Sequence, residues 1–131
     1  MSIKKNACLI IITLFLYMVN QLIKTEISNE VIRYFCICYY NDTIGSITFI
    51  AYCNLVLKNC GKSLDKLYKI ELTLFLAGIF WEYITPIFRS NTTTDILDII
   101  AYMIGGYIYW IIYKMDCNYS NNDIQKKEDI L

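Results

Sequence analysis

Apolar residues form four long blocks along the chain, separated by shorter stretches rich in lysine, aspartate and asparagine. The blocks cover residues 7–23, 40–57, 70–88 and 95–113. Each is close to the roughly 20 apolar residues that a helix needs to cross a bilayer. The pattern predicts an all-α bundle of four transmembrane helices within residues 1–115, followed by a polar cytoplasmic tail over residues 116–131.

A polar interruption lies in the second block, where Asn41, Asp42 and Thr43 follow an apolar run that starts at Tyr34. Charged side chains are costly inside a bilayer. We therefore expect this span to begin near Asp42, with the carboxylate at the membrane surface. The polar residues 24–33 then connect the first two spans.

The first block could also belong to a signal peptide, since Lys4 and Lys5 precede it as in a charged leader. The residues after Gln21 contain no small-x-small cleavage site. A retained helix is the prediction that we carry forward.

Lysine and arginine residues are distributed unevenly between the connections, and the side richer in them is normally cytoplasmic. With the amino terminus inside, the outer side receives only Lys24, Arg33 and Arg89. The sequence therefore predicts that both termini lie in the cytoplasm. The inner side receives Lys4, Lys5, Lys58, Lys62, Lys66, Lys69, Lys114, Lys126 and Lys127.

The composition supports the same class of protein and excludes several others. The chain has 131 residues and is 56% hydrophobic, which is typical of a membrane protein. Its formal net charge is zero, so it lacks the excess of positive charge that nucleic-acid binding usually requires. It has six cysteines without a CxxC spacing and no histidine, so the usual zinc sites cannot be assembled. We expect free thiols, no metal and no cofactor.

Ionisable residues from separate parts of the sequence gather at the outer surface in this topology. Such groups usually face a protein interior or a wet cavity. Paired charges that only hold helices together are the alternative, and for Asp95 and Asp98 so is compensation of a helix dipole. The gathered residues are Arg33, Asp42, Glu82, Arg89, Asp95 and Asp98.

Asp95 and Asp98 are three residues apart and therefore share a helix face. The same face continues through Tyr102 to Gly105 and Gly106. Small residues let helices approach closely. We expect this face to lie against the other helices, with Gly105 and Gly106 at the packing contact.

This part of the chain resembles the VanZ-like family of small bacterial membrane proteins. The resemblance covers about a quarter of the chain and departs from the family at Thr85, Pro86 and Ala101, where many members have amides. It implies a multispanning protein of the bacterial plasma membrane. The residues that carry it are Trp81-Glu82-Tyr83, Pro86, Arg89, Asp95-Ile-Leu-Asp98, Ala101-Tyr102 and Gly105-Gly106.

Three functions remain open. The first is binding of a lipid headgroup, such as an anionic lipid held by arginine, or of a cell-wall fragment. The second is a membrane enzyme with Glu82 or Asp98 as general base, although the chain lacks histidine and any nucleophile motif. The third is a structural subunit, or a transporter that would require a homo-oligomer. The candidate binding residues are Asp42, Glu82, Arg89, Asp95 and Asp98.

Overall fold

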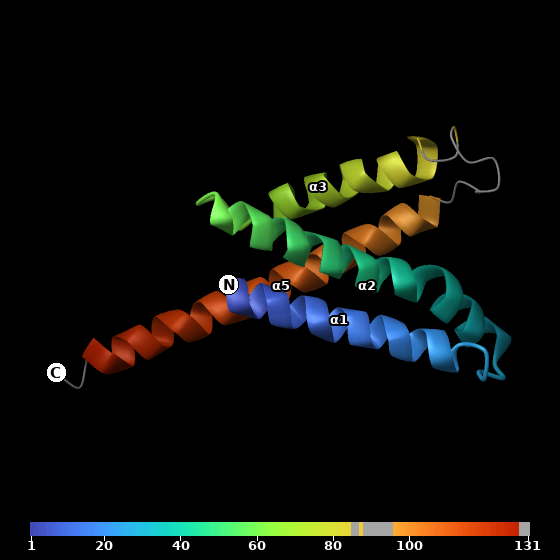
Figure 1. Cartoon of the computed structure of the whole chain (residues 1–131), viewed down its shortest axis with the longest axis horizontal. Coiled ribbons are helices and arrows are strands. Elements are labelled where there is room, and N and C mark those ends of the chain that lie inside the picture. The colour runs from blue at the N-terminus through green and yellow to red at the C-terminus, as the bar shows by residue number, and fades with distance from the viewer. Residues whose placement is uncertain (85–86, 88–95, 129–131) are drawn as a thin grey trace.

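The structure, a computed structural model, describes residues 1–84, 87 and 96–128, with side chains described as far as Tyr119. The described part of the chain forms four α-helices and one short π-helix, so the predicted all-α fold is confirmed. The elements are α1 (Ile3–Ile23), α2 (Glu30–Asn59), α3 (Leu67–Ile79), the π-helix η1 (Phe80–Ile84) and α5 (Ile96–Glu128) (Figure 1).

Local signals set the ends of α1 and α2. The Ser2 hydroxyl accepts the Lys5 amide at 3.3 Å, and the Asn29 side chain accepts the amides of Val31 and Ile32 at 3.0 and 3.2 Å. These side chains satisfy amides that lack a partner in the first turn of a helix. Gly61, with φ of 70°, ends α2 in the left-handed conformation that glycine adopts without strain.

The helices run up and down in an open layer. Helix α1 packs on α2, α2 packs on α5, and α5 packs on α3. Figure 1 shows that α1 begins, α2 ends and α3 begins at one end of this layer, while α3 ends and α5 begins at the other. Short connections between antiparallel helices produce this arrangement.

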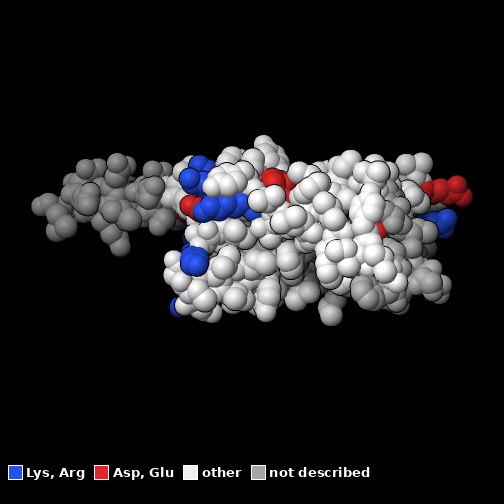
Figure 2. Space-filling view, turned by 90° about the horizontal axis from the view of Figure 1, so that it is seen from above, with Lys and Arg blue, Asp and Glu red and all other residues white. Residues whose placement is uncertain are grey.

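The two ends of the layer differ in charge. We name the first the basic end, because most of the described lysines lie there, among them Lys5, Lys58, Lys62 and Lys66, whereas Lys24 lies at the opposite end (Figure 2). Asp116 pairs there with Lys5 and, at 3.6 Å, with the chain's amino group. We name the second the acidic end, since Asp42, Glu82 and Asp98 lie toward it.

Two helices extend beyond the predicted apolar spans. Helix α2 begins at Glu30, so Arg33 and the polar interruption at Asn41 and Asp42 lie inside one continuous helix. Asn41 tolerates this position because its side-chain oxygen accepts the Asn20 amide from α1 at 2.9 Å. The polar residues point to a neighbouring helix and therefore do not mark a helix start.

The predicted polar tail is also helical over most of its length, because α5 continues to Glu128. No glycine or proline follows Gly106, so nothing in the sequence breaks the helix after the last apolar turn. Helix α5 therefore extends well beyond its apolar block.

Within the described residues, two helical segments are long and apolar enough to cross a membrane: Ile3–Ile23 and Ile96–Tyr119. Helix α3 has only 13 residues before it continues as the π-helix. Helix α2 has 30 residues, but polar side chains dilute its apolar character.

The bundle exposes far more apolar surface than a water-soluble bundle would. Many of the large apolar side chains are exposed, including Ile11 at 68%, Phe15 at 65% and Leu22 at 76% on α1. Soluble proteins rarely expose so large an apolar surface. The buried polar residues are Asn6, Thr13, Asn20, Ser46, Asn54 and Glu82.

Candidate functional site

Four side chains from three helical segments meet toward the acidic end. Asp42 on α2 hydrogen-bonds to the carboxyl group of Asp98 and to the hydroxyl of Tyr102, both on α5. Glu82 of the π-helix lies close enough to act electrostatically on Asp42 and Tyr102. We call Asp42, Glu82, Asp98 and Tyr102 the acidic cluster.

The local structure of each segment explains this convergence. Asp98 and Tyr102 are four residues apart on α5 and therefore share one face. Gly78 permits the close approach of α3, since a Cβ there would lie 3.0 Å from the Tyr102 ring. The π-helix then follows and holds Glu82 at 8% exposure, while its neighbours Phe80 and Tyr83 face outward.

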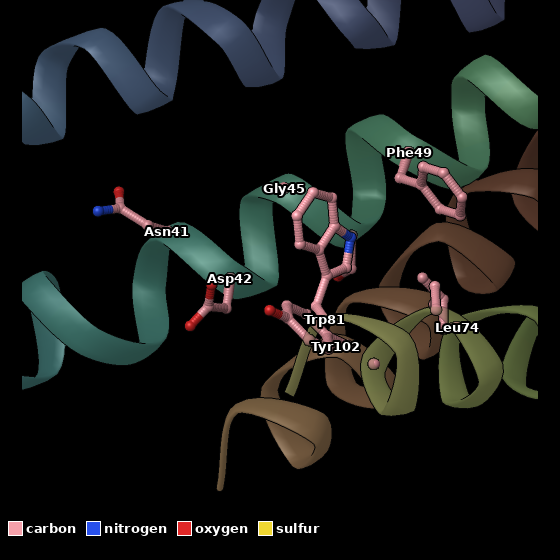
Figure 3. A pocket seen from close by; sticks show the side chains of 10 residues that line it. Asn41, Asp42, Gly45, Phe49, Leu74, Trp81 and Tyr102 are labelled. Carbon is pink, nitrogen blue, oxygen red and sulfur yellow. The ribbon is translucent and has the colours of Figure 1, made fainter. Parts of the chain in front are cut away.

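A cavity of about 310 Å³ opens beside the acidic cluster, between α2, α3 and α5. Asp42 and Tyr102 are the cluster members that line it, and Figure 3 shows the Tyr102 hydroxyl turned toward the Asp42 carboxyl group. Trp81 and Phe49 add aromatic walls, and Asn41, Gly45, Ser46, Leu74, Ala77 and Gly78 complete the lining.

The contact between two carboxyl groups has a chemical consequence. A hydrogen bond between Asp42 and Asp98 requires one shared proton, because two ionised carboxylates repel each other and neither can donate. Glu82 adds a third acidic group nearby. The cluster therefore suits a ligand that brings positive charge or hydrogen-bond donors.

Three of the five predicted binding residues, Asp42, Glu82 and Asp98, are thus neighbours in space. The other two, Arg89 and Asp95, lie outside the described residues. Arg33 is exposed on α2, nine residues or about 13 Å of helix before Asp42. In the described ranges, no group of three or more side chains has the geometry of a metal site, and all six cysteines are free.

The glycine pair of α5 lies at two different helix contacts. A Cβ on Gly105 would collide with the Ser46 side chain and lie 2.5 Å from the Thr43 carbonyl oxygen of α2. A Cβ on Gly106 would collide with the Leu74 side chain of α3. Adjacent glycines thus let α5 approach both neighbours, which brings their polar residues to the cluster.

A second buried polar group lies toward the basic end and was not predicted. The Tyr109 hydroxyl donates to Asn6 of α1 at 2.8 Å and accepts from Asn54 of α2 at 2.8 Å. Asn54 also bonds to the backbone of Leu64, at 3.0 Å to the carbonyl and 2.6 Å from the amide. We call Asn6, Asn54 and Tyr109, all 0% exposed, the amide network.

Sequence reasoning placed Tyr102 on the correct face but did not select it as a site residue. Its spacing of four from Asp98 was the available signal. Trp81 was named only among the residues of the family resemblance and not as part of a cavity wall. The amide network gave only a weak signal, since single asparagines in apolar blocks do not reveal their partners.

Comparison of the chain with protein-family models, with curated proteins and with solved structures finds no match in any of the three.

Proposed function

We propose that this chain is a multispanning protein of the bacterial plasma membrane, with all four helices across the bilayer and both termini in the cytoplasm. Its acidic end faces outward and binds a polar group of the cell envelope, either a lipid headgroup or a cell-wall fragment. The resemblance to VanZ-like proteins supports the envelope location.

The large exposed apolar surface supports the membrane location. Exposed apolar side chains such as Phe15 and Leu76 suit lipid, whereas the buried polar side chains link helices to one another. One such link is between the hydroxyls of Thr13 and Thr48, 2.8 Å apart. Interhelical hydrogen bonds of this kind are typical of membrane bundles.

Helix lengths are compatible with four spans. Helix α3 and the π-helix together cover residues 67–84, which corresponds to about 27 Å at the α-helical rise. Helix α2 is longer than the hydrocarbon core of about 30 Å, so it can span with its first turns outside. The lysines at the basic end favour the cytoplasmic side for that end.

The observation that carries the binding proposal is the convergence of Asp42, Glu82 and Asp98 on Tyr102 beside a cavity. The described lining offers carboxyl, amide and hydroxyl groups together with the aromatic faces of Trp81 and Phe49. These groups fit the amine and hydroxyl substituents of a headgroup or amino sugar. In the sequence, Arg89 lies seven residues after Glu82 and could pair with an anionic part of the same ligand.

A binding measurement on purified protein in bicelles tests this proposal. Short-chain phosphatidylethanolamine and muramyl dipeptide serve as probes for the two ligand classes. We expect one of them to raise the midpoint of thermal unfolding by several degrees, since saturation at 100 times Kd stabilises by about 2.7 kcal/mol. The double variant Asp42→Asn, Asp98→Asn should lose that shift.

Asp65→Asn is the matched control, because Asp65 lies in the connection between α2 and α3, at the basic end. It should keep the full shift. If neither probe stabilises the wild-type protein, or if the double variant responds as the wild type does, binding at the acidic cluster is refuted. A purely structural role for the cluster would then be favoured.

One observation also favours a second function, a membrane enzyme acting on a lipid-linked substrate. Two carboxyl groups within hydrogen-bonding distance, such as those of Asp42 and Asp98, can exchange a proton with a substrate when one of them is protonated. Turnover of a lipid-linked cell-wall precursor by the wild-type protein, lost in Asp98→Asn, would support the enzyme.

A further inference from the structure

A polar cavity of about 460 Å³ lies at the basic end, in the connection between α2 and α3. Helix α2 ends and α3 begins at this end of the bundle (Figure 1). The cavity is therefore separate from the acidic cluster, which lies toward the other end. Its described lining consists of Leu57, Lys62, Ser63, Leu64, Asp65 and Lys69.

The connection carries an excess of positive charge. Residues 58–69 contain four lysines and one aspartate. The aspartate is already neutralised, because the Asp65 carboxylate pairs with the Lys69 ammonium at 3.0 Å. None of the ion pairs among the described residues involves Lys62 or Lys66. The cavity thus presents lysines to which the described part of the chain supplies no counter-charge.

The backbone around the cavity is held in place by the buried amide network. Asn54 accepts the Leu64 amide at 2.6 Å and donates to the Leu64 carbonyl at 3.0 Å. The Lys62 amide donates to the Leu57 carbonyl at 2.9 Å, in a turn that Gly61 permits with its φ of 70°. A site that is shaped before binding loses less conformational entropy when the ligand arrives.

The charges of the lining select an anion. A lysine ammonium group binds phosphate as a point charge. It has three donors, so Lys69 can keep its bond to Asp65 and still donate to a phosphate oxygen. Among the described lining residues Asp65 is the one carboxylate, and it is already paired, so the amine of a zwitterionic headgroup would find no free acid there.

The position of the cavity favours a lipid over a soluble phosphate. Leu57 ends the second apolar block of the sequence, and Lys58 starts the connection. The lining includes the apolar side chains of Leu57 and Leu64, and the nearby Val56 and Tyr68 are 42% and 62% exposed. An occupant therefore meets hydrocarbon as well as positive charge, as the glycerol and phosphate of a lipid do at the bilayer edge.

We propose that this cavity binds the phosphate of an anionic lipid of the inner leaflet, of the phosphatidylglycerol type. Lys62 and Lys69 hold the phosphate, and Lys66, which acts electrostatically on Asp65, adds positive charge beside it. Basic pockets on the cytoplasmic side of membrane proteins bind anionic headgroups in this way. The inference rests on the proposed membrane location and orientation and adds a site at the opposite end from the acidic cluster.

An NMR titration tests the phosphate site, with the backbone amides of Ser63 and Leu64 as reporters of the lining. Dihexanoyl phosphatidylglycerol is added to the full chain in phosphatidylcholine bicelles. We expect a saturable shift of both amides that weakens at higher ionic strength. Dihexanoyl phosphatidylethanolamine and glycerol 3-phosphate, the zwitterionic and the soluble probe, should bind at least about tenfold more weakly.

Three variants sharpen this test. Lys62→Gln should raise the Kd for dihexanoyl phosphatidylglycerol about fivefold, since one lysine of the lining is lost. Lys4→Gln is the matched control, because it removes an exposed lysine from the same end but outside the cavity, and it should leave the Kd unchanged. Asp65→Asn should lower the Kd, because it releases Lys69 from its ion pair.

Three results would overturn the assignment. Equal weakening by Lys62→Gln and Lys4→Gln would replace the site with diffuse attraction to the basic end. Equal affinity for glycerol 3-phosphate would replace the lipid with a soluble phosphate. Absence of a saturable shift would refute binding at the cavity and leave the binding proposal for the acidic cluster intact, because its probes act at the other end.

The inner-leaflet source of the lipid is tested at Cys60, an exposed thiol in the same connection. A membrane-impermeant maleimide should leave Cys60 unmodified in intact cells and modify it after permeabilisation, as mapped by mass spectrometry. Modification in intact cells would overturn the inner-leaflet source together with the proposed orientation.

Discussion

At the basic end of the bundle, Tyr109 lies between Asn6 and Asn54 and each polar atom of the trio has a partner. At the acidic end, Asp42 lies against Asp98 and near Glu82, so groups of like charge face one another. Satisfied neutral networks stabilise a fold, whereas clustered acids raise its free energy unless they hold protons or a ligand. The comparison supports our proposal that the basic end holds the helices together and the acidic end binds a ligand.

The largest expected effect comes from removing the branch point of the amide network. Asn54→Leu deprives the Leu64 amide, the Leu64 carbonyl and the Tyr109 hydroxyl of a buried partner. Each unsatisfied group costs about 1–3 kcal/mol, so we expect a loss of at least about 3 kcal/mol. Equilibrium unfolding in bicelles measures it.

Asn59→Leu is the control, because it makes the same substitution at an exposed site on the same helix. It should leave the free energy of unfolding nearly unchanged. Equal effects of the two variants would mean that the buried network contributes no special stability.

Substitutions at glycine test how closely the helices must pack for the acidic cluster to form. Gly105→Ala should cost about 1–3 kcal/mol, since the new methyl meets the Thr43 carbonyl, a backbone group that cannot rotate away. Gly106→Ala should cost less, because the Leu74 side chain can move. The same bicelle unfolding assay ranks them.

Gly45→Ala is the matched control, since no atom lies within 4 Å of a Cβ at that position. It should be neutral or stabilising by up to about 1 kcal/mol through helix propensity. A loss at Gly45 as large as that at Gly105 would contradict the packing account.

A smaller effect is expected when only the hydroxyl of the network is removed. Tyr109→Phe leaves the ring in place but takes the partner from the Asn6 oxygen, while Asn54 keeps its bonds to Leu64. We expect a loss of about 1–2 kcal/mol. Tyr107→Phe, at a ring that is 50% exposed, should have almost no effect, and a similar loss there would argue against the network.

The smallest effect is expected at the exposed ion pair between Asp65 and Lys69, near the start of α3 at the basic end. A hydrogen bond from Lys69, at 3.0 Å, holds the pKa of Asp65 below its ordinary value. Because the pKa of Asp65 is lowered, its pairing with Lys69 stabilises the fold above about pH 4. This stabilisation is lost as the pH falls through the lowered pKa. In an NMR titration, Lys69→Gln should return the Asp65 pKa toward its ordinary value, and an unchanged pKa would contradict the pairing.

The sequence predicted the helices well because composition alone defines apolar blocks. It predicted the positions of Asp42, Glu82 and Asp98 relative to one another only through the inferred orientation of the chain. The π-helix at Phe80–Ile84 could not be predicted, since one additional residue in a turn leaves the hydrophobic pattern almost unchanged. The continuation of α2 back to Glu30 could not be predicted, because Asn41 and Asp42 resemble a surface segment until their partners on other helices are known.

The most direct test of the contrast between the two ends is the free energy of unfolding of the double variant Asp42→Asn, Asp98→Asn in ligand-free bicelles. Our account predicts a value equal to or above that of the wild type, because neutral amides relieve the repulsion among the acidic groups and keep hydrogen-bonding capacity. A loss as large as that of Asn54→Leu would contradict it and would assign the acidic cluster to holding the helices together.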